Sequence, residues 1–149
     1  MKPRLYLDTS VVSAYVDDRL PERGRATVEF WERLVEYDVT ISELTLTEIQ
    51  ETENPEQREE MVRLVRPFAV LPIAEEARRL ARQYVHPAVF SPGTGDDALH
   101  VAVAVTSRQE IFVSWNFWHL VNCRRRGLIN EVNILLGYPR IEILAPPEV

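Results

Sequence analysis

Short apolar runs alternate with longer helical patterns along this chain. The first run, Arg4–Leu7, ends at Asp8 and predicts a buried strand. Thr9 and Ser10 follow as good N-cap residues, so we expect a helix to begin there and to continue through Tyr15. The same succession, a short strand and then a helix, recurs towards the C-terminal end.

Further elements follow from the same patterns. Runs rich in apolar and β-branched residues predict strands at 38–42, 68–73, 110–114 and 141–144. Apolar residues at helical spacing predict helices from Pro21 through Leu34 and at 44–50, 55–65, 74–85 and 120–136.

The stretch Asp96–Val105 fits two structures. Its alternating valines and alanines suit a strand, whereas its length and alanine content suit a buried helix. A strand here would need a tight hairpin to the next strand, and residues 106–109 lack the glycine that such turns favour. We therefore predict a helix, preceded by a glycine-containing loop at 91–95.

Alternating strands and helices predict an α/β fold with a mainly parallel sheet. The 149 residues suit a single domain, 1–149. No apolar run approaches the roughly 20 residues of a membrane span, and Asp8 comes too early for a signal-peptide core. One cysteine, Cys123, excludes an internal disulfide framework. We expect a cytoplasmic protein that does not enter the membrane.

The charge balance is acidic. The chain carries 17 basic and 23 acidic residues, a net charge of −6, which argues against a nucleic-acid coat protein with a basic footprint. It does not exclude a nuclease, because carboxylates that hold divalent cations lower the formal charge. The basic run Arg124–Arg126 suits either a solvated face or contacts with RNA phosphates.

Four polar residues are expected at one edge of the sheet. Asp8 ends the first strand, and Glu48 lies in the helix after the second. Asp97 starts the helix after the glycine loop, and Asn116 follows a late strand. Ligands of open parallel sheets bind beyond the carboxyl ends of the strands. Carboxylates gathered there repel one another unless a cation lies among them, and oxygen ligands suit Mg²⁺ or Mn²⁺.

Each of these residues also has an ordinary structural interpretation. Asp8 can cap a helix, and Glu48 can be an exposed helix carboxylate. Asp96 and Asp97 suit the first turn of any helix, and Asn116 suits a turn. The metal site is favoured because all the positions fall on one edge.

Two other kinds of site are weaker alternatives. His119 and Cys123 stand four residues apart on a predicted helix, and with His100 they can share a soft metal. A structural histidine and a buried thiol are the commoner interpretation. The Asp8–Ser10 triplet resembles that of aspartic proteases, but their fold is all-β and this chain is rich in helices.

Taken in order, several motifs resemble those of the PIN domain family. They are Tyr6–Val11, Leu46–Ile49, Asp97–Ala104, Val113–Phe117 and the closing segment Ile141–Glu148. Each motif alone is weakly specific, whereas the ordered set is more specific and spans nearly the whole chain. The resemblance implies a three-layer α/β/α sandwich around a mainly parallel sheet.

The resemblance also assigns residues to the site. Asp8, Glu48 and Asp97 match the acidic metal ligands of the family, which selects Asp97 over its neighbour Asp96. Ser114 matches a small hydroxyl residue often found near the last ligand. Asn116 stands where many members have a fourth acid, and a sub-group of the family carries Trp-Asn here. Asn116 is expected to orient a water or to complete the metal shell.

The implied function is a Mg²⁺- or Mn²⁺-dependent endoribonuclease that leaves a 5′-phosphate, like the toxins of toxin–antitoxin pairs. RNA is then the substrate, and a small antitoxin protein is the partner. Whether the protein also forms a homodimer is left undecided by the sequence. The alternative is a catalytically weak or silent module that binds RNA or a protein. Tyr15, Phe30, Trp31 and Leu34 offer a partner surface. If Phe30 and Leu34 instead pack on the sheet, we expect Trp31 to point to another side of the helix and to mark an interface there.

Overall fold

The computed structural model describes residues 1–85 and 95–149. Within them a single sheet has the order β3-β2-β1-β4-β5, and every neighbouring pair is parallel. The strands are β1 (Arg4–Leu7), β2 (Asp38–Ser42), β3 (Ala69–Leu71), β4 (Ile111–Val113) and β5 (Glu142–Leu144). The predicted α/β class and parallel sheet are confirmed.

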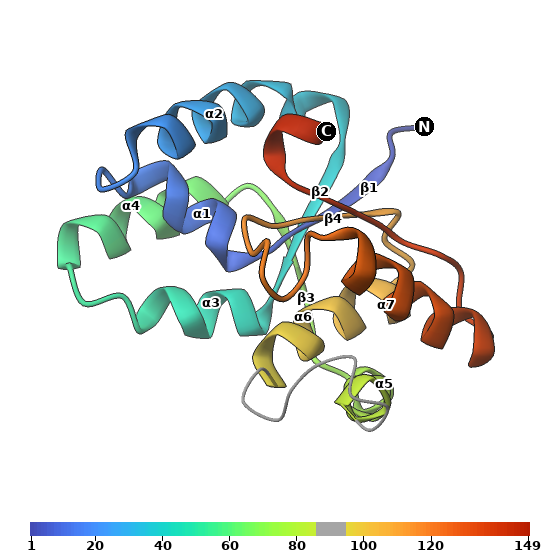
Figure 1. Ribbon diagram of the computed structural model, residues 1–149. Coiled ribbons are helices and arrows are strands. Elements are labelled where there is room, and N and C mark those ends of the chain that lie inside the picture. Colours follow the sequence, from blue (N-terminus) through green and yellow to red (C-terminus); the bar gives the residue numbers. More distant parts are fainter. Residues whose placement is uncertain (86–94) are drawn as a thin grey trace.

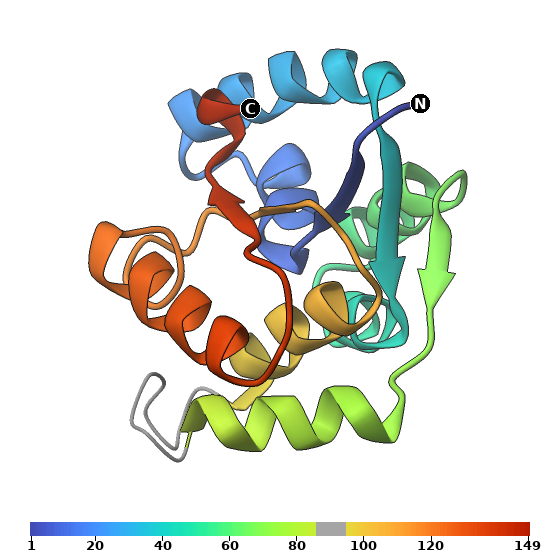
Figure 2. The ribbon, with the colours of Figure 1, turned by 90° about the vertical axis from the view of Figure 1, so that its right-hand side faces the viewer.

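Helices cover both faces of the sheet. They are α1 (Thr9–Val16), α2 (Pro21–Glu32), α3 (Glu43–Gln50), α4 (Pro55–Val65), α5 (Glu75–Val85), α6 (Gly95–Thr106) and α7 (Cys123–Leu135), with 3-10 turns η1 (Arg33–Glu36) and η3 (Pro146–Glu148). Helices α1 to α4 lie on one side of the strands and α5 to α7 on the other (Figures 1 and 2). The three-layer sandwich is therefore also confirmed.

The central strand β1 anchors the core. Its residues Leu5, Tyr6 and Leu7 are fully buried, because helices cover the sheet on both faces. From β1 the chain moves outward through β2 to β3, and then returns past β1 to β4 and β5. The direction of winding reverses between β1 and β4, and such a switch point is where ligands bind in open α/β sheets.

The helix predicted over Asp96–Val105 is present as α6. The predicted loop at 91–95 falls, from 91 to 94, outside the described residues. Among the helices in residues 1–85 and 95–149, none has the length and apolar character that crossing a bilayer requires.

Three local predictions were wrong. Asp8, not Thr9 or Ser10, is the N-cap residue of α1, because Asp8 keeps an extended backbone and the helix begins at Thr9. Helix α7 begins only at Cys123, after a turn that contains Leu120. Trp31 does not point outward: it is partly buried, and its ring lies against Tyr15 and Phe68, at 5.2 and 5.8 Å between ring centroids. The expected packing of Phe30 and Leu34 in the core is confirmed.

Candidate metal centre

The candidate site lies where β1 and β4 end side by side. Asp8 follows β1 and Ser114 follows β4. The backbone N–H of Asp8 donates to the carbonyl of Val113 at 3.0 Å, and that of Ser114 donates to the carbonyl of Leu144 at 3.0 Å. The hydrogen bonds of the sheet thus continue one residue past the strands and fix both side chains at the winding reversal.

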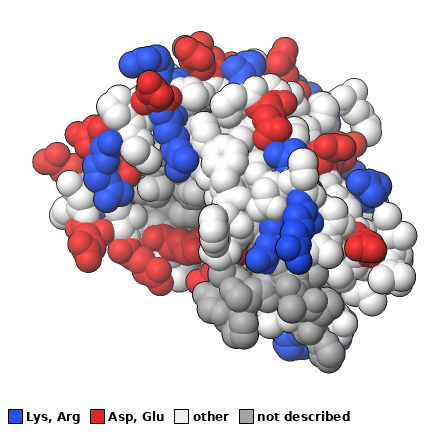
Figure 3. Space-filling view, in the orientation of Figure 1, with Lys and Arg blue, Asp and Glu red and all other residues white. Residues whose placement is uncertain are grey.

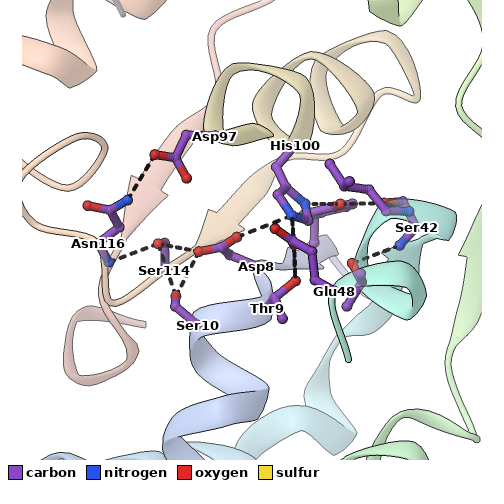
Figure 4. Close-up of polar contacts among 12 residues, drawn as sticks. Asp8, Thr9, Ser10, Ser42, Glu48, Asp97, His100, Ser114 and Asn116 are labelled. Carbon is purple, nitrogen blue, oxygen red and sulfur yellow. Dashed lines mark hydrogen bonds and ion pairs between the residues drawn. The ribbon is translucent and has the colours of Figure 1, made fainter. Parts of the chain in front are cut away.

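The Asp8 carboxylate is held by two hydroxyl groups. It is 4% exposed, and its Oδ2 accepts hydrogen bonds from Ser10 Oγ at 2.7 Å and from Ser114 Oγ at 2.8 Å. Figure 4 shows these contacts at the centre of a polar network. Because Ser10 comes from α1, the first turn of that helix helps to orient the carboxylate.

Asp97 enters the network from the start of α6. Its Oδ2 accepts a hydrogen bond from Asn116 Nδ2 at 3.2 Å, and the Asn116 backbone N–H donates to Ser114 Oγ at 2.9 Å. Burial, and next the charge of Asp8, raise the pKa of Asp97 from 3.8 to about 6. These two carboxylates therefore repel each other, and a hard divalent cation is the ligand that their oxygen atoms fit.

Glu48, from α3, is turned towards a histidine. Its Oε1 accepts a hydrogen bond from Thr9 Oγ1 at 2.6 Å and lies 2.5 Å from Nε2 of His100. Burial alone would raise the pKa of Glu48, but the hydrogen bond and charge of His100 and the hydrogen bond from Thr9 lower it overall. Glu48 and Asp8 thus meet at the same nitrogen of His100, and the charge of Glu48 also contributes to the raised pKa of Asp97.

His100 is the residue that the sequence prediction undervalued. It is 1% exposed, its Nε2 lies 3.6 Å from Asp8 Oδ1, and its Nδ1 lies 2.6 Å from Tyr6 Oη. Burial lowers the pKa of His100, but its contacts with Glu48 and Asp8 raise it overall. The available signal was its spacing: Asp97 and His100 stand three apart on one helix and therefore share a face.

The remaining candidates lie elsewhere or differ from the prediction. Asp96 is exposed, whereas Asp97 is half-buried. His119 precedes α7 and Cys123 starts it, so they do not share one helix face, and the Cys123 thiol is exposed. In the described part of the chain, no three His, Cys, Asp or Glu side chains are already grouped to hold a metal ion. This finding applies to Asp8, Glu48 and Asp97 as well as to the soft-metal alternative.

The fold and the acidic network define a parallel α/β/α protein with its candidate site beyond the ends of its central strands. The family model of the PIN domain matches residues 5–116. The chain belongs to the PIN domain family.

Solved structures share this fold at low sequence identity. VapC20 of Mycobacterium tuberculosis, described as a Sarcin-Ricin loop cleaving toxin, has a TM-score of 0.62 and 13% identity over 93% of this chain and 98% of that one. The VapBC2 structure from Rickettsia felis, bound to a DNA fragment from their promoter, has a TM-score of 0.58 and 11% identity, over 95% and 97%.

A toxin–antitoxin complex from Klebsiella pneumoniae has a TM-score of 0.60 and 16% identity, over 82% of this chain and 93% of that one. A comparison with curated proteins found no match. At these identities, the similarity to solved structures establishes the fold.

Proposed function

We propose that this protein is a metal-dependent endoribonuclease and the toxin of a toxin–antitoxin pair. The observation that carries the proposal is the convergence of Asp8, Asp97 and Asn116 at the reversal between β1 and β4. Membership of the PIN domain family supports it, as does the fold shared with the VapC20 toxin that cleaves the Sarcin-Ricin loop.

Asp8 and Asp97 would hold Mg²⁺ or Mn²⁺, and Glu48 would complete the acidic set. When bound, such a cation supplies Lewis-acid stabilisation of the charge on the attacked phosphate. The protein's own residues prepare this site: Ser10 and Ser114 orient the Asp8 carboxylate, and the Asn116 amide holds that of Asp97. Asn116 cannot add a negative charge, so it serves as a positioning amide.

The test compares two neighbouring acids. Asp97→Asn removes a carboxylate from the network and should abolish Mn²⁺-dependent cleavage of RNA. Asp96→Asn changes the same charge on an exposed neighbour and should weaken cleavage only modestly. Cleavage of total RNA, followed by mapping of 5′-phosphate ends, measures both. Equal activity of Asp97→Asn and wild type would overturn the proposed site.

A small antitoxin is the proposed partner, and the cytoplasm the proposed compartment. VapBC and toxin–antitoxin complexes share this fold. Expression of the protein alone should slow bacterial growth, and co-expression with the product of the adjacent upstream gene should restore growth and give a complex on pull-down. Normal growth with the protein alone, and no complex, would remove the toxin assignment.

A second candidate is a PIN module that binds RNA or a protein without cleaving. The contact of Glu48 with His100 favours it, because a carboxylate oxygen that is bonded to an imidazole is less available to a metal ion. Purified protein that binds RNA but leaves it intact in both Mg²⁺ and Mn²⁺ would support this alternative.

A further inference from the structure

A pocket opens directly beside the candidate metal centre. It has a volume of about 550 Å³, within the range of small-ligand sites. Ser10 and Asn116 form part of its wall, and both also belong to the network around Asp8 and Asp97. A ligand in the pocket would therefore lie next to the proposed cleavage site.

Aromatic side chains form the outer wall of this pocket. They follow β4 in the segment 115–118, which we call the aromatic turn. Trp118 is 82% exposed and Phe117 is 46% exposed. Exposed apolar surfaces of this kind usually mark binding sites. Their exposed rings offer flat faces to a ligand.

The aromatic turn is anchored to the rest of the fold through Trp115. The Trp115 indole Nε1 donates a hydrogen bond to Thr27 Oγ1 at 2.9 Å, and its backbone N–H donates to Ser10 Oγ at 3.0 Å. One anchor reaches α2 and the other reaches α1. The exposed rings are therefore presented from a fixed base and not from a free loop.

Arg23 supplies a positive charge to the same pocket. Its guanidinium lies 4.8 Å from the Trp115 ring centroid and 5.9 Å from that of Phe117. Among the described residues, no carboxylate lies within ion-pair distance of Arg23, whereas Arg19, also in the wall, is paired with Asp17 at 2.7 Å. Figure 3 shows basic side chains around the start of α2 and acidic ones over α3.

We propose that this pocket binds an unpaired nucleobase of single-stranded RNA, stacked on Trp118 and Phe117, with an adjacent phosphate on Arg23. This inference rests on the proposed ribonuclease function. Proteins that hold single strands combine aromatic platforms for bases with positive charge for the backbone. RNA is favoured over a protein segment because the pocket adjoins the acidic network, where a scissile phosphate would lie.

The first experiment measures binding without cleavage. Fluorescein-labelled single-stranded U₁₂ and A₁₂ RNA are titrated with the protein in EDTA and followed by anisotropy. Trp118→Ala should weaken binding of the better-bound oligomer about 5- to 150-fold, the range for loss of one base–aromatic stack. Trp118→Phe should retain most of the affinity. Leu135→Ala, at an equally exposed apolar residue on α7, is the matched control and should bind like wild type.

A spectroscopic signal reports stacking directly. Trp118 is the one highly exposed tryptophan, because Trp115 is buried and Trp31 is partly buried. Unlabelled RNA should quench wild-type tryptophan fluorescence, and Trp118→Phe should lose most of that quench while still binding. Arg23→Gln should weaken binding and reduce the dependence of log Kd on log salt concentration by about one. Arg78→Gln, on α5, is its control.

These outcomes separate the inference from the proposed function. With RNA cleavage as readout, Trp118→Ala should raise KM and leave kcat nearly unchanged. Wild-type protein that binds neither oligomer, prefers duplex RNA, or binds as well after Trp118→Ala would overturn the pocket assignment. The pocket assignment would also be overturned if Trp118→Ala kept its RNA binding and lost only the binding of a protein partner. Absence of cleavage in wild type, with RNA still quenching Trp118, would overturn the nuclease but keep the pocket.

Discussion

His100 shows how a buried polar side chain is accommodated at the residue scale. An imidazole in the core needs partners for both ring nitrogens. Tyr6 lies at one nitrogen, and Glu48 with Asp8 lies at the other. Tyr6 also contacts Ser42 Oγ at 2.7 Å. A line of polar contacts therefore runs from the end of β2 through His100 to the candidate metal centre.

We predict that Tyr6→Phe lowers both stability and RNA cleavage. The substitution leaves His100 Nδ1 buried without a partner, which costs about 1–3 kcal/mol of unfolding free energy, and it loosens the hold on Glu48. Urea denaturation and cleavage assays measure the two effects.

Tyr84→Phe is the matched control for this prediction. Tyr84 is also fully buried, and its hydroxyl donates to Asn133 Oδ1 at 2.5 Å, a hydrogen bond between α5 and α7 that includes no residue of the acidic network. It should lose comparable stability and keep its activity. An equal loss of activity in both variants would assign Tyr6 to the general stability of the fold.

Asp97 should make metal-free stability depend on pH. Its pKa is higher in the folded state, about 6, than the ordinary 3.8. The folded chain then binds more protons, so this group destabilises the fold increasingly as the pH rises from about 4 to 6. In EDTA at pH 7.5, Asp97→Asn should stabilise the protein by on the order of 1 kcal/mol, a value reduced for partial exposure.

Most of the gain should disappear near pH 3.5, where the carboxyl group is mostly protonated in both states. Asp96→Asn removes the same charge from an exposed position and should give little gain at either pH. Urea denaturation at the two pH values tests this. A gain from Asp97→Asn that does not change with pH would contradict it.

The sequence could predict that Asp8 and Asp97 lie at the same edge of the sheet, but not how each side chain turns. Asp8 and Asp97 are located by topology, since each follows directly from where a strand ends or a helix begins. The contact between Glu48 and His100 depends on how elements far apart in sequence pack together, and spacing alone carries no such information. The role of His100 was predictable only from its shared helix face with Asp97.

At the scale of elements, apolar runs predicted the strands well. The bounds of β2 and α4 agree with the sequence prediction because a proline or a polar residue marks each start. The segment before α7 was predicted less well because side-chain hydrogen bonds replace helical ones there. Asn116 Oδ1 accepts from the His119 N–H, and Asn122 Oδ1 accepts from that of Arg125. Such local side-chain bonds compete with helix formation.

Helix α2 should control the stability of the aromatic turn. Thr27→Val keeps the shape of the side chain but removes the buried acceptor of the Trp115 indole N–H. The unpaired donor should cost about 1–3 kcal/mol and weaken binding of U₁₂ or A₁₂ RNA. Thr47→Val, at an exposed threonine whose hydroxyl bonds within α3, is the control. Unchanged stability of Thr27→Val would contradict this anchoring.

At the scale of the whole molecule, metal binding should stabilise the fold. A ligand at about 100 times its dissociation constant adds about 2.7 kcal/mol, or roughly 5–10 °C in Tm for a chain of this size. Thermal melts in millimolar Mn²⁺ should therefore exceed those in EDTA. Asp97→Asn, which lacks one proposed ligand, should show a much smaller difference. Identical melts of wild type in Mn²⁺ and EDTA would count against the site.

The central position of β1 has a consequence for synthesis. This strand leaves the ribosome well before its partner β4: Asp8 and Ser114, which share a hydrogen bond, are 106 residues apart. Contacts of such long range slow folding. A nascent chain that stops before β4 lacks the paired ends of β1 and β4, where the candidate site lies, and it also lacks the aromatic turn. The candidate metal centre and the aromatic turn therefore assemble only after β4 has been made.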